Sequence, residues 1–254
     1  MRTATAPNLG SYHGYGSPDG ALIAHSAPVR NIAPTCPLDG LLLEFLAERR
    51  QQAAEGVPSQ KLVGPAYPSV SSLLNPERSV YSHPLSKVFT DILRTFPDLS
   101  KLPEQVAVLY IMFLIMRWQI SPTVENYNRL PDWATPRPSQ LFTAHPAWID
   151  HLPWPYMRDK MVHTYQNYPF ENFFIPFTTT LSLNWPYEDA DTLLSIPESD
   201  EFMINPVFER HLRNLQNWSL GPAFARAFPA LVETTKIKAD SQRLASWESL
   251  SRLI

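Results

Sequence analysis

Cysteine is almost absent from the sequence, and its scarcity limits the kinds of site that the chain can carry. The single cysteine, Cys36, cannot form a disulfide within the chain. This fits a reducing compartment, so we expect a nuclear or cytoplasmic protein in which Cys36 is a small packing residue. Because the sequence has neither paired cysteines nor a His-Glu-x-x-His pattern, the common zinc sites are excluded and we expect no bound metal.

Glycine is also scarce, at 8 of 254 residues, and this excludes several cofactor sites. Gly14, Gly16 and Gly20 lack the spacing of a dinucleotide-binding loop, and no phosphate-binding loop or Gly-x-Ser-x-Gly motif occurs. We therefore expect no cofactor and assign no catalytic residue, although the sequence leaves catalytic activity open. Residues 1–34 hold half of the glycines and show no hydrophobic period, so we predict a disordered leader there.

Charge is low in amount and nearly balanced. Charged residues make up 18% of the chain, the formal net charge is -3, and the longest basic cluster is Arg49-Arg50. Such a chain has no field that would attract a phosphate backbone, so we expect no direct nucleic-acid binding. With 44% hydrophobic residues, the composition argues against a disordered or coiled-coil chain and predicts a packed core.

No hydrophobic run is long enough to cross a membrane. The most apolar run, residues 106–116, would span about 17 Å as a helix, whereas the bilayer core measures about 30 Å. Residues 1–30 have no apolar stretch of the kind that a signal peptide requires. We therefore expect no membrane association, and we predict that residues 106–116 lie in a buried core helix.

Apolar residues at helical spacing predict a mainly α fold, a single globular helical domain with a central buried helix and proline-rich connecting loops. We place this domain at residues 35–232 and an amphipathic C-terminal tail at residues 233–254, with Leu244, Trp247, Leu250 and Ile254 on one side. Prolines at first helical positions and glycines at the ends set the bounds. Helices are predicted at residues 37–55, 84–96 and 103–118, from Pro206 to the Gly221-Pro222 pair, and shortly before Pro229. Residues 177–185 fit a helix or a strand equally well.

One polar constellation stands in the glycine-free middle of the chain. His145, Asp150 and His151 lie close together in sequence, and Arg158 follows. Imidazole and carboxylate groups together can ligate a metal or move protons, because histidine titrates near neutrality and a neighbouring carboxylate fixes its tautomer. However, His145 and His151 are six positions apart with a proline between them, which matches no standard ligand spacing. Structural capping of turns is the favoured interpretation.

Tryptophans crowd the middle and the end of the chain. Such rings can form the walls of an apolar ligand pocket, or they can be core anchors whose indole N–H finds a carbonyl. Arg117 follows the apolar run, so we predict that it is buried and paired with Asp150 or Glu125; alternatively, it points into a cavity and binds an acidic ligand. The candidate ligand-binding residues are Arg117, Trp118, His145, Trp148, Asp150, Trp154, Arg158 and Trp185.

Several separated motifs resemble a known family. They are Tyr67-Pro-Ser-Val-Ser-Ser-Leu-Leu-Asn-Pro76, His83-Pro-Leu-Ser-Lys87, Arg117-Trp118, Gln140-Leu141, His145-Pro-Ala-Trp-Ile-Asp150, Leu152-Pro-Trp-Pro155, Asn184-Trp-Pro186, Asn205-Pro206 and Asn217-Trp218. From about Cys36 to Leu231 the chain resembles the fungal domain of unknown function associated with bZIP-type transcription factors. The resemblance implies a nuclear regulatory module, and it supplies no catalytic residues.

The chain departs from that family upstream of Cys36. No basic run with a DNA-contacting asparagine and no heptad leucines occur there, so direct DNA binding is not implied. Our leading hypothesis is a non-enzymatic regulatory or sensing domain that binds a protein partner or an apolar small molecule.

Two other hypotheses remain open. One is a fungal pathway enzyme that uses a Trp-lined pocket, with Asp150 and His145 or His151 as acid and base. The other is a dimerisation module that uses the first helix or the tail, so a homodimer is possible. An enzyme should show a closed pocket in which Asp150 and a histidine meet, whereas a sensor should show an apolar pocket without that geometry.

Overall fold

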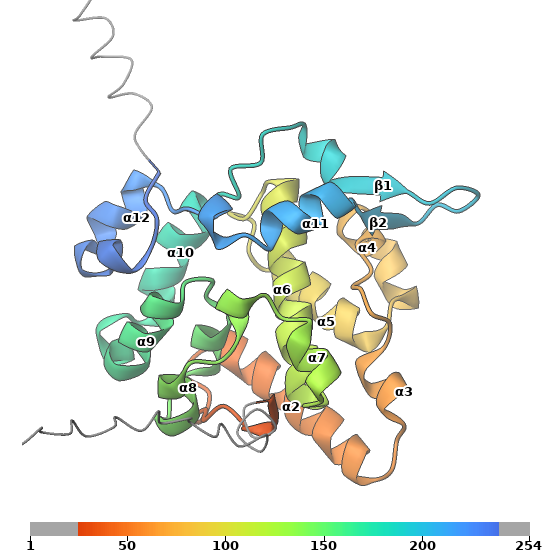
Figure 1. The fold of residues 1–254 in the computed structure, drawn as a ribbon, viewed down its shortest axis with the longest axis horizontal. Helices are drawn as coiled ribbons and strands as arrows, with labels where there is room; N and C mark the ends of the chain where they lie inside the picture. Colours follow the sequence, from red (N-terminus) through yellow and green to blue (C-terminus); the bar gives the residue numbers. More distant parts are fainter. Residues whose placement is uncertain (1–24, 239–254) are drawn as a thin grey trace, which may run out of the picture.

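The computed structural model describes residues 25–238, and this part of the chain is mainly helical, with one small two-stranded sheet (Figure 1). The predicted fold class is therefore confirmed. In chain order the elements are α2 (Pro37–Ala54), α3 (Ser59–Val63), α4 (Ser71–Leu74), the 3₁₀ helix η1 (Pro76–Tyr81), α5 (Pro84–Arg94), α6 (Leu102–Ile120), α7 (Val124–Asn128), η2 (Asp132–Ala134), α8 (Pro138–Phe142), η3 (Ala147–His151), α9 (Pro155–Thr164), η4 (Tyr165–Asn167), α10 (Phe170–Thr180), η5 (Asp189–Thr192), β1 (Leu193–Ser195), β2 (Phe202–Ile204), α11 (Pro206–Leu212), η6 (Leu215–Asn217), α12 (Pro222–Ala227) and η7 (Pro229–Thr234).

Helix α6 is the centre of the fold, as its composition predicted. Residues on all of its faces are buried, and α2, α3, α5 and α7 pack around it. A helix that is apolar on every side needs this enclosure, because any exposed face would leave apolar surface in water. No helix among residues 25–238 has both the length and the hydropathy of a membrane span.

Helix α2 begins at Pro37 because Cys36 caps it. The Cys36 Sγ accepts from the Asp39 N–H at 3.5 Å, and the cysteine is buried, as expected for a packing residue. The helix ends beside Gly56, whose φ of +87° lies in the left-handed region that glycine tolerates. Leu38, Leu42 and Leu46 face the core, whereas Leu41 is 46% exposed. The Asp39 carboxylate accepts from the Trp148 N–H at 2.8 Å and so joins α2 to η3.

The sequence left residues 177–185 ambiguous between helix and strand, and the structure places the start of this segment in helix α10. It continues through Pro176 to Thr180, and Ser182 then forms a bridge with Ser219 instead of a strand. The hydroxyl of Thr180 donates to the Pro176 carbonyl at 2.7 Å. Such back-bonds from threonine hydroxyls supplement the backbone hydrogen bonds of the last helical turns.

Helix α11 is shorter than predicted. It starts at Pro206 behind the cap Asn205, but it ends at Leu212 instead of reaching Gly221. The indole N–H of Trp218 donates to the Leu212 carbonyl at 2.7 Å, which satisfies the helix end and turns the chain. Gly221 instead precedes α12 as its cap residue.

The ends of the described region pack on the body. Residues 25–34 were predicted to belong to the disordered leader, yet Arg30 and Ile32 pair with the segment around His145 through backbone hydrogen bonds of 3.0 Å. At the other end, Leu220 pairs with Ile237 in an isolated bridge. The predicted apolar side of the tail, Leu244 to Ile254, lies outside the described residues.

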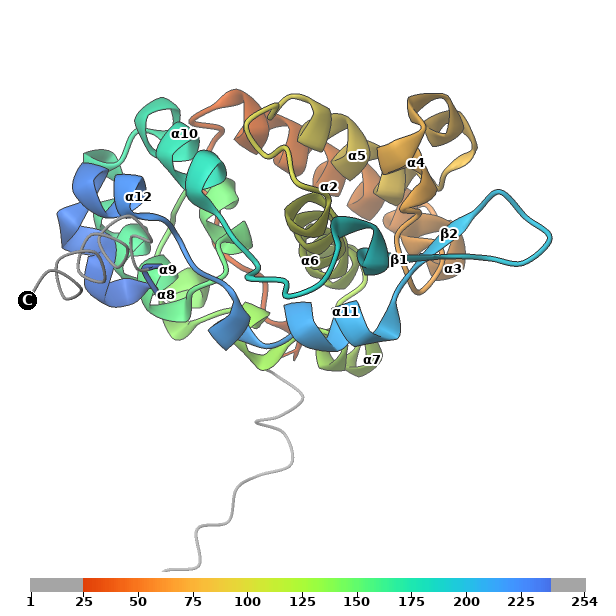
Figure 2. The same ribbon diagram turned by 90° about the horizontal axis from the view of Figure 1, so that it is seen from above.

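The helices form two groups. Figure 2 shows α8, α9, α10 and α12 together on one side and α2, α5 and α6 on the other. The short helix η3 packs against both α2 and α6 as well as α9, so it connects the groups. The region between the groups contains the candidate site.

Candidate functional site

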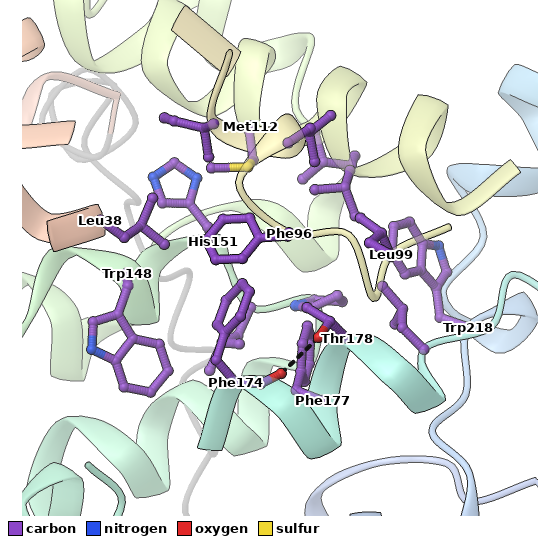
Figure 3. Close-up of a pocket in the computed structure, with 17 residues that line it drawn as sticks. Leu38, Phe96, Leu99, Met112, Trp148, His151, Phe174, Phe177, Thr178 and Trp218 are labelled. Atoms are coloured by element: carbon purple, nitrogen blue, oxygen red, sulfur yellow. Dashed lines mark hydrogen bonds between the residues drawn. The ribbon is translucent and has the colours of Figure 1, made fainter. Parts of the chain in front are cut away.

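An apolar cavity of about 60 Å³ lies between the two groups of helices (Figure 3). One wall comes from α5, α6 and the loop between them, and the opposite wall comes from α10. Side chains of η3 close one end, and Trp218 closes the other. The lining residues are Leu38, Ile92, Leu93, Phe96, Leu99, Val108, Ile111, Met112, Trp148, His151, Leu152, Pro153, Phe174, Phe177, Thr178, Leu181 and Trp218.

His151 is the titratable group in this lining. Its ring lies near Met112 and Phe96 in Figure 3, and its Nδ1 is buried with no hydrogen-bond partner among the described residues. Burial lowers the pKa of His151 to about 4, against an opposing effect of the Asp150 charge. The imidazole is therefore neutral at pH 7, and its Nδ1 can donate or accept one hydrogen bond according to the tautomer. An unpaired buried polar atom costs about 1–3 kcal/mol, so a bound hydrogen-bonding group would relieve a real penalty.

The cavity is smaller than a typical ligand. An apolar cavity of about 150 Å³ stays dry and binds benzene, so a 60 Å³ cavity needs to widen before it can hold a ring. The α10 wall packs mainly on α12 and faces α5 and α6 across the cavity. Phe96 and Phe174 meet across it, with ring centroids 4.2 Å apart. Their separation would open the cavity.

His145 and Asp150 meet, as the sequence suggested, but away from this cavity. The His145 Nε2 lies 2.8 Å from the Asp150 Oδ1, and its Nδ1 lies 2.7 Å from the Thr143 carbonyl. Because both ring nitrogens face acceptors, the ring is an imidazolium ion paired with a carboxylate. Asn31 and Gln140 also donate to Asp150, at 2.9 and 2.6 Å.

The pKa shifts of the pair agree with this assignment. Burial alone would lower the pKa of His145, but the hydrogen bond and charge of Asp150 raise it above its ordinary value. Burial likewise opposes ionisation of Asp150, but the bonds from His145, Asn31 and Gln140 bring its pKa below its ordinary value. Every polar side-chain atom of His145 and Asp150 has a hydrogen-bond partner within the protein. The pair is suited to holding residues 31, 140 and 150 together rather than to exchanging protons.

Arg158 extends this buried network through Gln140. Its Nε donates to the Gln140 Oε1 at 3.0 Å, and its two terminal nitrogens donate to the carbonyls of Trp133, Thr135, Leu152 and Pro153 at 2.6–3.3 Å. Burial lowers the pKa of Arg158 to about 10, so the guanidinium stays charged at pH 7. Arg158 therefore fastens the proline-rich connection between α7 and α9.

Arg117 is buried, as predicted, but its expected partner is wrong. Its Nε donates to the Asn126 Oδ1 at 2.9 Å, and one terminal nitrogen donates to the carbonyls of Val63, Gly64 and Pro65. Neither Asp150 nor Glu125 forms a salt bridge with it, because the chain of residues 63–65 passes closer and offers three carbonyls. Arg117 lines none of the cavities described here, so the structure gives no support to an acidic ligand there.

Most of the tryptophans are anchors. The indole N–H groups of Trp118, Trp133, Trp185 and Trp218 donate to backbone carbonyls at 2.7–3.0 Å, which confirms that interpretation for these four. Of the eight predicted ligand-binding residues, Trp148 alone lines the cavity. Trp118 and Trp154 line separate surface hollows, and Trp185 packs on Phe208 and His211.

The predicted site residues did not include the apolar side chains that form the walls of the cavity. Phe174 and Phe177 had the helical spacing that now places them on one wall, so that signal was present. Phe96 continued the apolar spacing of the helix predicted over residues 84–96, although it lies in the loop after α5, whereas Leu99 of the same loop has no such pattern. Among residues 25–238, no group of three or more histidine, cysteine, aspartate or glutamate side chains could hold a metal ion.

The pKa values of His145 and His151 are shifted in opposite directions, and this predicts a stability maximum near pH 6.5. An unfolded chain protonates His151 below about pH 6.5, whereas the folded protein does so only near pH 4, so stability should fall as the pH drops across that window. His145 keeps its proton above its ordinary pKa in the folded protein, so stability should also fall as the pH rises through its raised pKa. We expect the acid limb to be on the order of 3 kcal/mol.

Urea unfolding across pH 4–9 measures both limbs. His151→Asn should flatten the acid limb above pH 4, and His145→Gln should flatten the alkaline limb at a cost in stability. His163→Asn, at an exposed histidine of α9, should leave both limbs unchanged. An acid limb that survives in His151→Asn would contradict the assignment.

Comparisons with known proteins give one match. A family model described as "Domain of unknown function (DUF3425)" matches residues 113–240, just over half of the chain. No curated protein and no solved structure matched. The matched region starts within α6, so it supplies the α10 wall, η3 and Trp218, whereas the α5 wall and Leu38 come from residues before it.

Proposed function

The chain belongs to the DUF3425 family, and on this premise we propose that it is a non-enzymatic regulatory or sensing domain that binds a small, mainly apolar molecule. It would act in the nucleus or cytoplasm, as its resemblance to the domain associated with fungal bZIP-type transcription factors suggests. The observation that carries the proposal is the apolar cavity with one unpaired imidazole nitrogen between the two groups of helices. Such a cavity favours an apolar ligand with a single polar group.

The charge state of His151 narrows the class of ligand. The ring is neutral at pH 7, and no lysine or arginine lines the cavity, so a carboxylate would enter without a counter-ion. A hydroxyl or carbonyl group could instead pair with the neutral ring at little cost. We therefore favour a neutral ligand, such as an alcohol, a phenol or a ketone on an apolar body.

The enzyme hypothesis has less support. Asp150 and His145 meet within hydrogen-bond reach, but neither lines the cavity and both are fully bonded to other protein groups. His151, which does line it, has no carboxylate hydrogen-bonded to its ring. A general acid or base must reach the substrate, so this arrangement favours a binding site.

Thermal shifts with two probe molecules test the ligand class. Benzyl alcohol and toluene have similar apolar bodies, but only the alcohol offers a hydroxyl to His151. At ten times its Kd the alcohol should add about 1.4 kcal/mol of stability. This corresponds to a melting temperature higher by about 3–6 °C. At the same concentration, toluene should raise the melting temperature less, because it leaves the His151 Nδ1 unpaired and so binds more weakly.

Matched variants give the controls. His151→Phe should remove the preference for the alcohol, whereas His163→Phe, on the surface of α9, should keep it. Native mass spectrometry of the protein purified from its own host should also show a bound small molecule. If neither probe raises the melting temperature and the native protein is empty, the proposed function is wrong.

We also predict no specific binding to duplex DNA by this chain alone. Affinity for DNA depends on neutralising phosphates with lysine and arginine clusters, and the chain has a net charge of -3 with no long basic run. Electrophoretic mobility shifts with mixed-sequence duplexes should show no complex at physiological salt. A nanomolar, salt-dependent shift with any duplex would contradict this.

A further inference from the structure

The β1–β2 hairpin projects from one end of the molecule, beside α4 and η1 (Figures 1 and 2). The strands are antiparallel, with Leu193 opposite Ile204 and Leu194 opposite Met203. Because side chains alternate along a strand, Leu193 and Ile204 face the body and are buried, whereas Leu194 and Met203 face outward. Ile196 continues the outward row.

The outer face of the hairpin is apolar and exposed. Leu194, Ile196 and Met203 are 42%, 38% and 47% exposed, although a solvent-facing strand position usually carries a polar side chain. Arg78 of η1 bonds to Asp200 and Glu201 in the hairpin turn, so η1 lies against the turn. On η1, Val80 and Tyr81 are 74% and 91% exposed. Several large apolar side chains therefore meet water at one corner of the protein, as in interaction surfaces.

The sequence around this face is strongly acidic. Residues 188–201 contain six acidic side chains, all exposed, and no lysine or arginine. Arg78 pairs with two of them, Asp200 and Glu201, and no salt bridge within residues 25–238 involves Glu188, Asp189, Asp191 or Glu198. An apolar face with an acidic border is complementary to a ligand that is both basic and apolar. It would repel a second copy of itself as well as any nucleic acid.

One edge of the hairpin is already covered. The N–H of Phe202 on the outer edge of β2 donates to the Ser71 hydroxyl at 2.9 Å, so α4 covers that edge. Approach to the outer face therefore comes from the side of β1 or from directly above the row formed by Leu194, Ile196 and Met203.

We propose that the outer face of the β1–β2 hairpin is a docking surface for a basic segment of a partner protein that carries apolar side chains among its lysines and arginines. The apolar side chains would cover Leu194, Ile196 and Met203, and the basic groups would pair with the acidic residues at both ends of the hairpin. Since the hairpin lies outside the apolar cavity, this surface does not depend on ligand binding there.

Fluorescence anisotropy with synthetic peptides tests the surface on the full chain. The probe is a short peptide in which lysines alternate with leucine and isoleucine, and the reference peptide has serine at the apolar positions with the same charge. We expect the apolar peptide to bind at least about tenfold more tightly than the reference. Binding of the reference should vanish as salt rises, because surface charges alone are screened.

Surface variants locate the binding. Leu194→Ser with Met203→Ser should weaken binding of the apolar peptide at least about tenfold. Leu41→Ser with Val124→Ser, at positions 46% and 47% exposed on other elements, should not change it. The melting temperatures of both double variants should stay near that of the wild type. Equal binding by the two double variants, equal binding of the two peptides, or self-association through Leu194 and Met203 would each overturn the proposal.

Discussion

Replacing Arg158 with methionine should lower the free energy of unfolding by about 3–5 kcal/mol. The guanidinium is about 1% exposed, and it donates to four backbone carbonyls and to Gln140. Methionine fills a similar volume but donates no hydrogen bond. The carbonyls of Trp133, Thr135, Leu152 and Pro153 would then lose a partner in a place that water does not reach, and each such loss costs about 1–3 kcal/mol.

Arg137 provides a matched control on the neighbouring surface. Its side chain is 40% exposed and forms a salt bridge of 2.9 Å with Asp159. Because solvent screens such a pair, Arg137→Met should cost at most about 1 kcal/mol. Urea unfolding followed by circular dichroism measures both variants. If Arg158→Met is as stable as Arg137→Met, then the loops do not depend on the buried guanidinium.

For Arg117, the sequence predicted burial but not the hydrogen-bond partners. The apolar run before Arg117 correctly indicated burial, because a chain segment that is apolar on all faces carries its neighbours into the interior. The hydrogen-bond partners of Arg117 could not be predicted from the sequence. The Arg117 bonds reach residues 63–65, more than 50 positions earlier, where the relevant groups are backbone carbonyls that every residue possesses. Composition cannot single out such acceptors, whereas it can single out a carboxylate, and this led to the wrong partner.

The helices show the same division between local and long-range information. The bounds of α2 and α5 followed from proline at the first position and from apolar spacing, which are properties of neighbouring residues. The end of α11 did not follow, because the bond from Trp218 to the Leu212 carbonyl depends on how the chain folds back. Helix α10 was ambiguous for a similar reason, since its packing, rather than its propensity, keeps Pro176 within a helix.

Only part of the candidate site could be predicted from the sequence. The proximity of His145 and Asp150 was evident from five positions of separation, but which histidine would face a cavity was not. That depends on η3, where consecutive residues point to opposite sides: Asp150 toward the buried network and His151 toward the apolar lining. The cavity itself needs walls from α5 and α10, about 80 residues apart in the chain. No periodic pattern covers such a distance.

Phe113→Ala should lower the free energy of unfolding by about 3–5 kcal/mol. Phe113 is fully buried in the middle of α6, where α2, α3 and α5 pack around the helix. Its ring does not line the apolar cavity, although its neighbour Met112 does. Truncation would therefore create a new void rather than enlarge an existing one, and a close-packed interior can collapse around it only in part.

Phe142, which is 75% exposed at the end of α8, is the control for loss of a phenyl ring. Phe142→Ala should change stability by less than about 0.5 kcal/mol, because its ring gives up little contact with the protein. Urea unfolding with a fixed slope gives both differences. Wild-type stability in Phe113→Ala would mean that α6 is peripheral, and the α5 and α6 wall of the cavity would then have no rigid support. A loss of about 3–5 kcal/mol would show that α6 is enclosed in the core, as its burial indicates.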